Sequence, residues 1–138
     1  MKHALHLLLA LAFYIPTSAN SSTFDECLNL SNSENKSYPT KLDELTTIIN
    51  QTCIEEKNRV IISYRYLVDL DSKGIPKGKE NEVFQKIKEY LKESVTKTFC
   101  TNKMFRAMLN EVDAKFEYFT HNKIEQFTTF TVTKRNCN

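Results

Sequence analysis

The chain has 138 residues and a net charge of +2 from 19 basic and 17 acidic residues, so it is nearly neutral at pH 7. The charges are spread along the chain, and no basic stripe indicates binding to nucleic acid or to an anionic membrane surface. Its two glycines lie outside any glycine-rich phosphate loop, which excludes a recognisable nucleotide-binding motif. The length is enough for one hydrophobic core but not for two.

The first 19 residues have the pattern of a secretory signal peptide. Lys2 precedes an apolar run from Leu5 to Ile15, and small residues follow up to Ala19. The run is shorter than the roughly 20 apolar residues that span a bilayer, so no membrane span is expected. We therefore expect cleavage after Ala19 and an exported protein, either periplasmic or secreted.

Four cysteines follow the predicted signal peptide, and they predict disulfide bonds. An even number of cysteines in a small exported chain usually forms a disulfide framework. Three pairings are possible; Cys27–Cys53 and Cys100–Cys137 are favoured because each joins the ends of a contiguous unit. The long gaps and the lack of a C-x-x-C pair argue against zinc, and neither a metal nor another cofactor is expected.

The segment after the signal peptide divides into a polar part and a β-rich part. Residues 20–38 are rich in Ser and Asn and predict a weak helix or a loop held by Cys27, ahead of a single domain over residues 39–138. Residues 45–54 are dense in β-branched residues and predict a strand, with a helix starting near Asp43 as the alternative. After a polar turn, residues 59–69 alternate as a strand with one apolar face: Val60, Ile62, Tyr64, Tyr66 and Val68.

The second half of the chain predicts two helices and a second hairpin. After a loop over residues 71–78, Asn81 is expected to cap an amphipathic helix. A shorter helix follows over residues 102–110, then strands over 112–119 and 124–133 joined by a turn. This order predicts an α+β fold in which helices pack on one face of an antiparallel sheet of about four strands. The apolar stripe of the long helix contains Val83, Phe84, Ile87, Tyr90, Leu91, Val95 and Phe99.

Few residues have the pattern of a catalytic site. His121 is the one histidine after the signal peptide and lies in a predicted turn, whereas a serine or cysteine nucleophile usually needs a histidine base. We therefore expect no catalytic residues and no enzymatic activity. Aromatic side chains are abundant in the predicted strands, and Phe119 and Phe127 have the parity opposite to the others. These two are predicted to point outward and to bind a protein partner.

The motif Cys100-Thr101-Asn102, followed by Arg106 and by a Tyr/Phe-rich hairpin that closes at Cys137, resembles a widespread group of small exported bacterial proteins. Within that group the sequence is similar to the beta-type pilotins of type II secretion, which bind a secretin segment and guide it to the outer membrane. The resemblance implies a shared Cys100–Cys137 disulfide, with Asn102 and Arg106 holding the turn between them.

These features predict a non-enzymatic exported binding or adaptor domain that recognises a protein partner, in the manner of a pilotin. Two alternatives come from other functional classes. One is a secreted virulence-associated effector or enzyme inhibitor, and the other is a divergent hydrolase.

Overall fold

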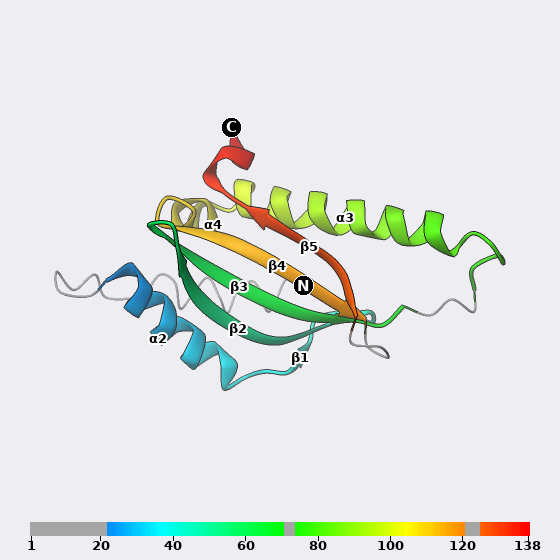
Figure 1. The fold of residues 1–138 in the computed structure, drawn as a ribbon, viewed down its shortest axis with the longest axis horizontal. Helices are drawn as coiled ribbons and strands as arrows, with labels where there is room; N and C mark the ends of the chain where they lie inside the picture. Colours follow the sequence, from blue (N-terminus) through cyan, green and yellow to red (C-terminus); the bar gives the residue numbers. More distant parts are fainter. Residues whose placement is uncertain (1–21, 71–73, 121–124) are drawn as a thin grey trace.

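The structure is a computed structural model that describes residues 22–70, 74–120 and 125–138. Figure 1 shows a twisted sheet with α2 along its β2 edge, α3 along its β5 edge, and the C-terminus beside the end of α3. The signal peptide predicted over residues 1–19 lies outside the described residues. The elements are α2 (Thr23–Asn35), β1 (Thr40–Lys41), β2 (Thr46–Glu56), β3 (Arg59–Val68), α3 (Glu80–Thr101), α4 (Lys103–Met108), β4 (Val112–Thr120), β5 (Gln126–Val132) and the 3₁₀ helix η1 (Lys134–Cys137).

The strands form one sheet in the order β1-β2-β3-β4-β5. Neighbouring strands are antiparallel except for β3 and β4, which are parallel. The predicted α+β class and both predicted hairpins are confirmed, but the sheet has a short fifth strand and one parallel pair. Alternation of side chains identifies a strand without showing which neighbour it joins. The helices between the two hairpins supply the crossover that a parallel pair requires.

A tight turn joins β2 to β3. Its two residues, Lys57 and Asn58, have φ angles of 49° and 64°. Two consecutive residues with positive φ are typical of a type I′ hairpin turn, whose twist matches that of the flanking strands. The turn sets Glu56 opposite Arg59 and so fixes the register of the whole hairpin.

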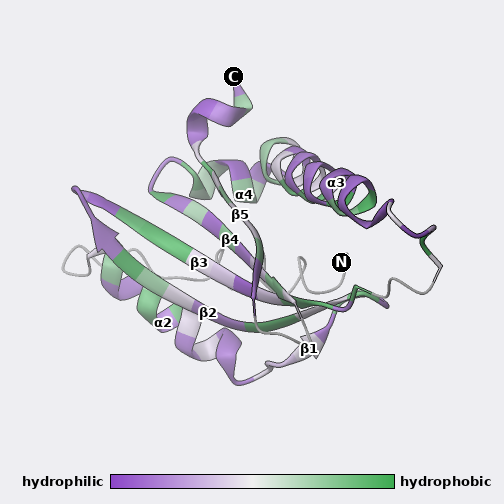
Figure 2. Ribbon diagram, turned by 45° about the vertical axis from the view of Figure 1, so that its right-hand side comes forward, coloured by the Kyte–Doolittle hydropathy of each residue, from purple (hydrophilic) through white to green (hydrophobic). Residues whose placement is uncertain are grey.

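One face of the sheet, which we call the inner face, carries the core. Alternate residues of β3 and β4 are buried on it, and their rings stack side by side. The Tyr66 and Tyr118 ring centroids are 4.6 Å apart, and Phe99 of α3 meets Phe116 edge-on at 5.2 Å. The hydropathy colouring in Figure 2 shows apolar bands along the strands and a largely polar outer side on α3.

Both long helices pack on this inner face. Phe99 of α3 contacts Tyr64, and Gln51, the Cα partner of Tyr64 on β2, is bonded to Ser31 of α2. Cross-strand partners share a face, so α2 and α3 cover the same side of the sheet. In Figure 1, α2 runs beside β2 and α3 lies beyond β5.

Two details of α3 differ from the prediction. The helix begins at Glu80 with Lys79 as its N-cap, so Asn81 lies inside the first turn and does not cap it. The carboxylates of Glu80 and Glu82 favour this start because they lie at the positive end of the helix dipole. Tyr90 is 67% exposed, although its spacing placed it in the apolar stripe. The described residues contain no helix both long enough and apolar enough to cross a bilayer.

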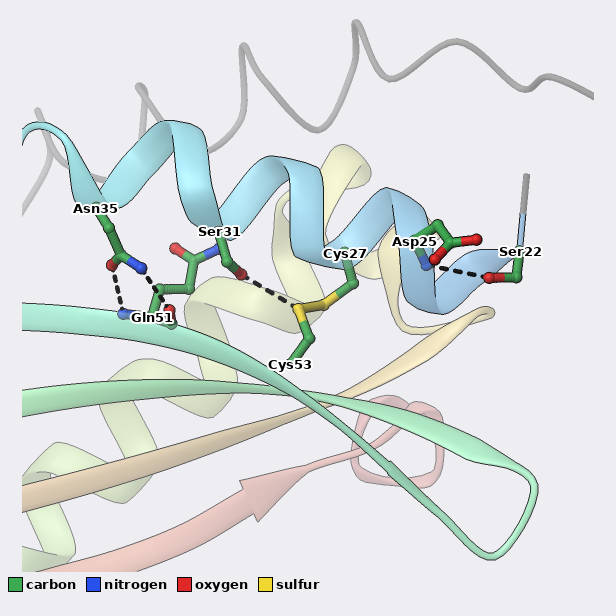
Figure 3. The surroundings of a disulfide bond; sticks show 7 residues. All are labelled: Ser22, Asp25, Cys27, Ser31, Asn35, Gln51 and Cys53. Atoms are coloured by element: carbon green, nitrogen blue, oxygen red, sulfur yellow. Dashed lines mark hydrogen bonds between the residues drawn. A yellow bond between two sulfur atoms is a disulfide. The ribbon is translucent and has the colours of Figure 1, made fainter.

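Each disulfide attaches one end of the described chain to another element of the fold. Cys27–Cys53 joins α2 to β2, as Figure 3 shows, and Cys100–Cys137 joins the end of α3 to η1. This is the pairing that the sequence favoured. The polar segment, predicted as a weak helix or a loop held by Cys27, therefore contains a helix that Cys27 attaches to the sheet.

Candidate protein-recognition surfaces

Phe119 and Phe127, the two predicted binding aromatics, lie in different surroundings. Phe119 is half-buried on the outer face of the sheet, in register with Leu67 of β3. Phe127 occupies a bulge in β5 and packs edge-on against Phe84 of α3 at 6.1 Å, with the Lys88 ammonium 5.2 Å from its ring centre. The bulge adds one residue to β5 and turns Phe127 toward α3. The two rings therefore do not form one outward patch.

The residues assigned to a turn motif have unequal roles. The Asn102 side chain caps α4 by accepting bonds from the backbone N–H groups of Met104 and Phe105 at 3.0 and 3.2 Å. Arg106 has an exposed side chain, and its backbone N–H donates to the Asn102 carbonyl at 2.9 Å. His121 lies outside the described residues. Within the part of the chain that is described, no cluster of three or more His, Cys, Asp or Glu side chains is arranged to hold a metal ion.

A shallow hollow of about 490 Å³ lies between the solvent side of α3 and the C-terminal η1. It contains charges of both signs and is bordered by the Cys100–Cys137 disulfide. No pattern in the sequence indicated this hollow, because Asn136 reaches it only through the fold of the last residues. Its lining residues are Glu89, Lys92, Glu93, Thr96, Lys97, Cys100 and Asn136.

A buried polar cluster lies between α2 and the inner face. Glu34 is 2% exposed, and one of its carboxylate oxygens accepts a 3.4 Å bond from the Tyr38 hydroxyl. Burial raises the pKa of Glu34 above its usual value, and the Tyr38 bond offsets part of that rise. The pKa of the Tyr64 hydroxyl is also raised, first by burial and then by the charges of Tyr38 and Glu34. The cluster is therefore expected to keep its tyrosines protonated.

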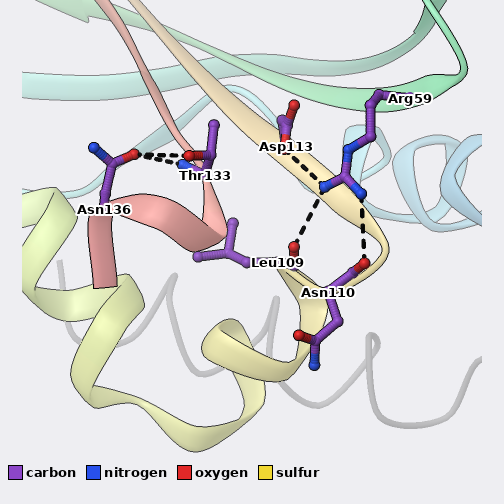
Figure 4. A network of polar contacts seen from close by, with 6 residues as sticks. All are labelled: Arg59, Leu109, Asn110, Asp113, Thr133 and Asn136. Atoms are coloured by element: carbon purple, nitrogen blue, oxygen red, sulfur yellow. Dashed lines mark hydrogen bonds and ion pairs between the residues drawn. The ribbon is translucent and has the colours of Figure 1, made fainter. Parts of the chain in front are cut away.

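The outer face of the sheet carries ion pairs. Arg65 pairs with Glu117 at 2.9 Å, and Arg59 pairs with Asp113 at 2.8 Å. Figure 4 shows that the Arg59 guanidinium also donates to the backbone carbonyls of Leu109 and Asn110, both at 3.4 Å. These contacts join the start of β3 to the loop after α4, so Arg59 is assigned a structural role. Half-exposed ion pairs of this kind are typical of a hydrated surface.

The two edges of the sheet differ. On the β2 edge, the Asn35 side-chain amide accepts from the Gln51 N–H and donates to the Gln51 carbonyl, both at 2.8 Å, as Figure 3 shows. Asn35 thereby occupies the place of a neighbouring strand. On the other edge, β5 is paired only with β4 among the described residues. Residue spacing could not have indicated the role of Asn35, because it depends on where α2 meets β2.

Comparison with known proteins shows likeness of fold. No protein-family description and no curated protein matches the sequence. A candidate secreted protein from Pseudomonas aeruginosa has a TM-score of 0.59 at 12% identity, covering 86% of this chain and 100% of its own. The type 2 secretion system pilotin EpsS from Vibrio vulnificus has a TM-score of 0.58 at 12% identity, covering 100% of this chain and 98% of its own. The resemblance to this structural group, inferred from the sequence, is confirmed.

Proposed function

We propose that the chain is an exported, non-enzymatic adaptor that binds a segment of a partner protein, in the manner of a pilotin of a type II secretion system. The fold shared with the pilotin EpsS over the whole of this chain is the observation that carries the proposal. Two disulfides add support for export, since such bonds persist in oxidising compartments. On this proposal the partner is a segment of a secretin.

The described structure suits such a role because it is a stiff platform. The stacked aromatic core fixes the sheet, and disulfides hold α2 to β2 and the end of α3 to η1. A pre-formed surface loses little conformational entropy on binding, so more of the contact energy contributes to affinity. The half-buried Phe119 and Phe127 remain the proposed aromatic contacts, each in its own part of the surface.

The proposal is tested with the protein purified in its exported, oxidised form. Its binding to a purified secretin segment from the same organism is measured by calorimetry, for the native chain and for Phe119→Ala, Phe127→Ala and His121→Ala. Removal of a buried aromatic anchor commonly costs about 2 kcal/mol at an interface, equivalent to a roughly 30-fold weaker Kd. We expect weaker binding by at least one phenylalanine variant.

The His121→Ala variant is the control and is expected to bind as the native chain does. Circular dichroism and a thiol assay check that each variant stays folded and oxidised. Loss of binding in the histidine variant alone would contradict the adaptor proposal and favour a hydrolase. Failure of the native protein to bind any secretin segment would remove the pilotin-like role.

A further inference from the structure

The exposed edge of β5 has the composition of a strand that accepts another strand. Its seven residues, Gln126–Val132, contain no charged residue, no proline and no glycine. Natural sheets usually protect an edge strand with lysine, proline or a very short strand, because unpaired backbone groups join other strands readily. One bulge, at Phe127, lies near the start of β5, and the rest of the strand is regular.

The backbone groups that point out of this edge can be assigned. Gln51 directs its N–H and C=O away from β3, because both groups bond to Asn35. Backbone direction alternates along a strand, so its partner Tyr64 directs its own groups toward β4. In the parallel pair, the backbone groups of Tyr64 therefore bond to the residues just before and just after Phe116. The backbone groups of Phe116 point the other way and bond to Phe130 of β5.

By the same alternation, Thr129 and Thr131 direct their N–H and C=O groups away from β4, toward the open edge. The bond from the Thr120 N–H to the Glu125 carbonyl at 2.8 Å fits this assignment, since it places the even-numbered residues of β4 toward β5. The side chains of Thr129 and Thr131 are themselves exposed. Two donors and two acceptors are therefore presented side by side at the end of the sheet.

We propose that the β5 edge binds an extended, uncharged segment of the partner protein as an added strand, through Thr129 and Thr131. The proposal rests on the proposed adaptor function. Backbone bonds would supply affinity, and alternate side chains of the added strand would cover the half-buried Phe127 and Phe130 at the margin of the inner face. An uncharged segment fits because β5 has no charged side chain to pair with, and the Lys88 ammonium beside it already lies over the Phe127 ring.

The position of α3 favours a single added segment over a second copy of this chain. Figures 1 and 2 both show α3 beyond β5, on the side away from β4. A second copy joined edge to edge would bring a whole sheet and its own α3 into that space. One extended segment needs only the width of a strand, about 4.8 Å.

Amide hydrogen exchange on the full exported protein tests the proposal. The probe is the synthetic peptide Thr-Val-Thr-Phe-Thr-Val-Thr, added in excess. We expect exchange at Thr129 and Thr131 to slow by about tenfold or more, while Gln51, already bonded to Asn35, stays unchanged. No slowing at Thr129 and Thr131 would overturn the proposal, as would a free protein that dimerises with these amides already protected.

A matched pair of variants separates the backbone from the side chain. Thr129→Pro removes the outward N–H without removing a β4–β5 bond, and Thr129→Ala keeps that N–H. We expect the proline variant to bind the peptide about tenfold more weakly and the alanine variant to bind within about twofold of the native chain. Equal binding by the two variants would contradict a backbone contact at this residue.

A second arm uses the purified secretin segment in place of the peptide. Protection of Thr129 and Thr131 by that segment would support the edge contact and the adaptor function together. If the segment binds and protects only other parts of the surface, the edge proposal is wrong and the adaptor function stands. Peptide protection without any binding of the secretin segment would support the edge site and contradict the secretin partner.

Discussion

The two edges of the sheet differ in whether their outward-facing backbone groups are covered. At the β2 edge, β1 pairs with residues 47 and 48, and Asn35 satisfies both backbone groups of Gln51. Farther along, Cys53 is bonded to α2, and β2 ends in the exposed acids Glu55 and Glu56. At the β5 edge α3 contacts Phe127 through Phe84, but among the described residues no further strand, side-chain amide or disulfide is bonded to β5 on that side. Cover by a helix, a side-chain amide and charge blocks the first edge, whereas the second keeps the geometry needed for strand addition.

The two edges of the sheet therefore differ in the accessibility of their backbone groups and not in the aromatic content of their strands. The rings of Tyr64, Tyr66, Phe116 and Tyr118 are buried in the core. They stabilise the platform and leave little area for a partner. The uncharged threonines of β5 contribute less to the core, and their backbone groups face outward. The edge with fewer internal contacts is therefore the one that we propose for recognition.

Removal of the Cys27–Cys53 disulfide should have the largest effect on the closed edge. We expect the double variant Cys27→Ser, Cys53→Ser to lose about 3–4 kcal/mol of unfolding free energy, because the bond closes a loop of 26 residues. Denaturant titration measures this loss. Exchange at Gln51 should become faster while β4 stays protected. A loss below about 1 kcal/mol would show that α2 is held mainly by its other contacts.

The Asn35→Ala variant should lower the unfolding free energy by about 2 kcal/mol. Gln51 is fully buried, so the variant leaves its backbone N–H and C=O without their bonds. Asn32→Ala is the matched control, since Asn32 lies on the same helix with an exposed side chain, and its loss should stay below about 0.5 kcal/mol. Equal losses in the two variants would contradict the edge-blocking role of Asn35.

Glu34 should make the α2 side of the fold sensitive to pH. Its folded pKa is raised by burial, so the folded state holds the proton more tightly than the unfolded state does. The contribution of Glu34 to stability is therefore complete below the ordinary pKa of about 4.5 and is lost as the pH rises through the folded value. Glu34→Gln should be more stable than the native chain at pH 7 and should lose that advantage at pH 4.

Denaturant titrations of both proteins at the two pH values measure this difference. The Glu34 variant is compared with Glu26→Gln, the same exchange at another position of the same helix. A stability advantage of Glu34→Gln that is as large at pH 4 as at pH 7 would show that its ionisation is not the cause.

The smallest loss of stability among these variants is expected for proline at Thr129 of β5. We expect Thr129→Pro to cost about 1 kcal/mol or less, because the lost N–H points away from β4. Phe130→Pro should cost about 3 kcal/mol or more, because it removes a bond to Phe116. Thermal denaturation distinguishes the two. If the Thr129 variant is the less stable one, the alternation of backbone groups along β5 has been assigned wrongly.

Local patterns in the sequence predicted most of the elements. The alternation from Val60 to Val68 identifies β3 and its buried face, and the apolar spacing up to Phe99 identifies α3. Asn102, named as a turn residue by resemblance, caps α4. These features follow from contacts within a few residues of one another, which is the range that periodicity and capping rules describe.

Three features that depend on long-range placement were missed. The parallel β3–β4 pair follows from a crossover of more than 40 residues, and no spacing within either strand indicates it. The inward turn of Phe127 comes from an extra residue in the pairing with β4. The closure of the β2 edge by Asn35 joins residues 16 positions apart across a loop and a strand. Each is set by how elements meet, so the parity of a residue within its own strand could not show it.

Hydrogen exchange of the free protein tests the contrast between the edges most directly. With Asn35 bonded to Gln51, and with Phe130 bonded to Phe116, the amides of Gln51 and Phe130 should exchange slowly. Those of Thr129 and Thr131 should exchange close to the rates of an unprotected chain. If Thr129 and Thr131 are instead protected as strongly as Phe130 in the isolated protein, the β5 edge is already covered and the contrast between the edges is wrong.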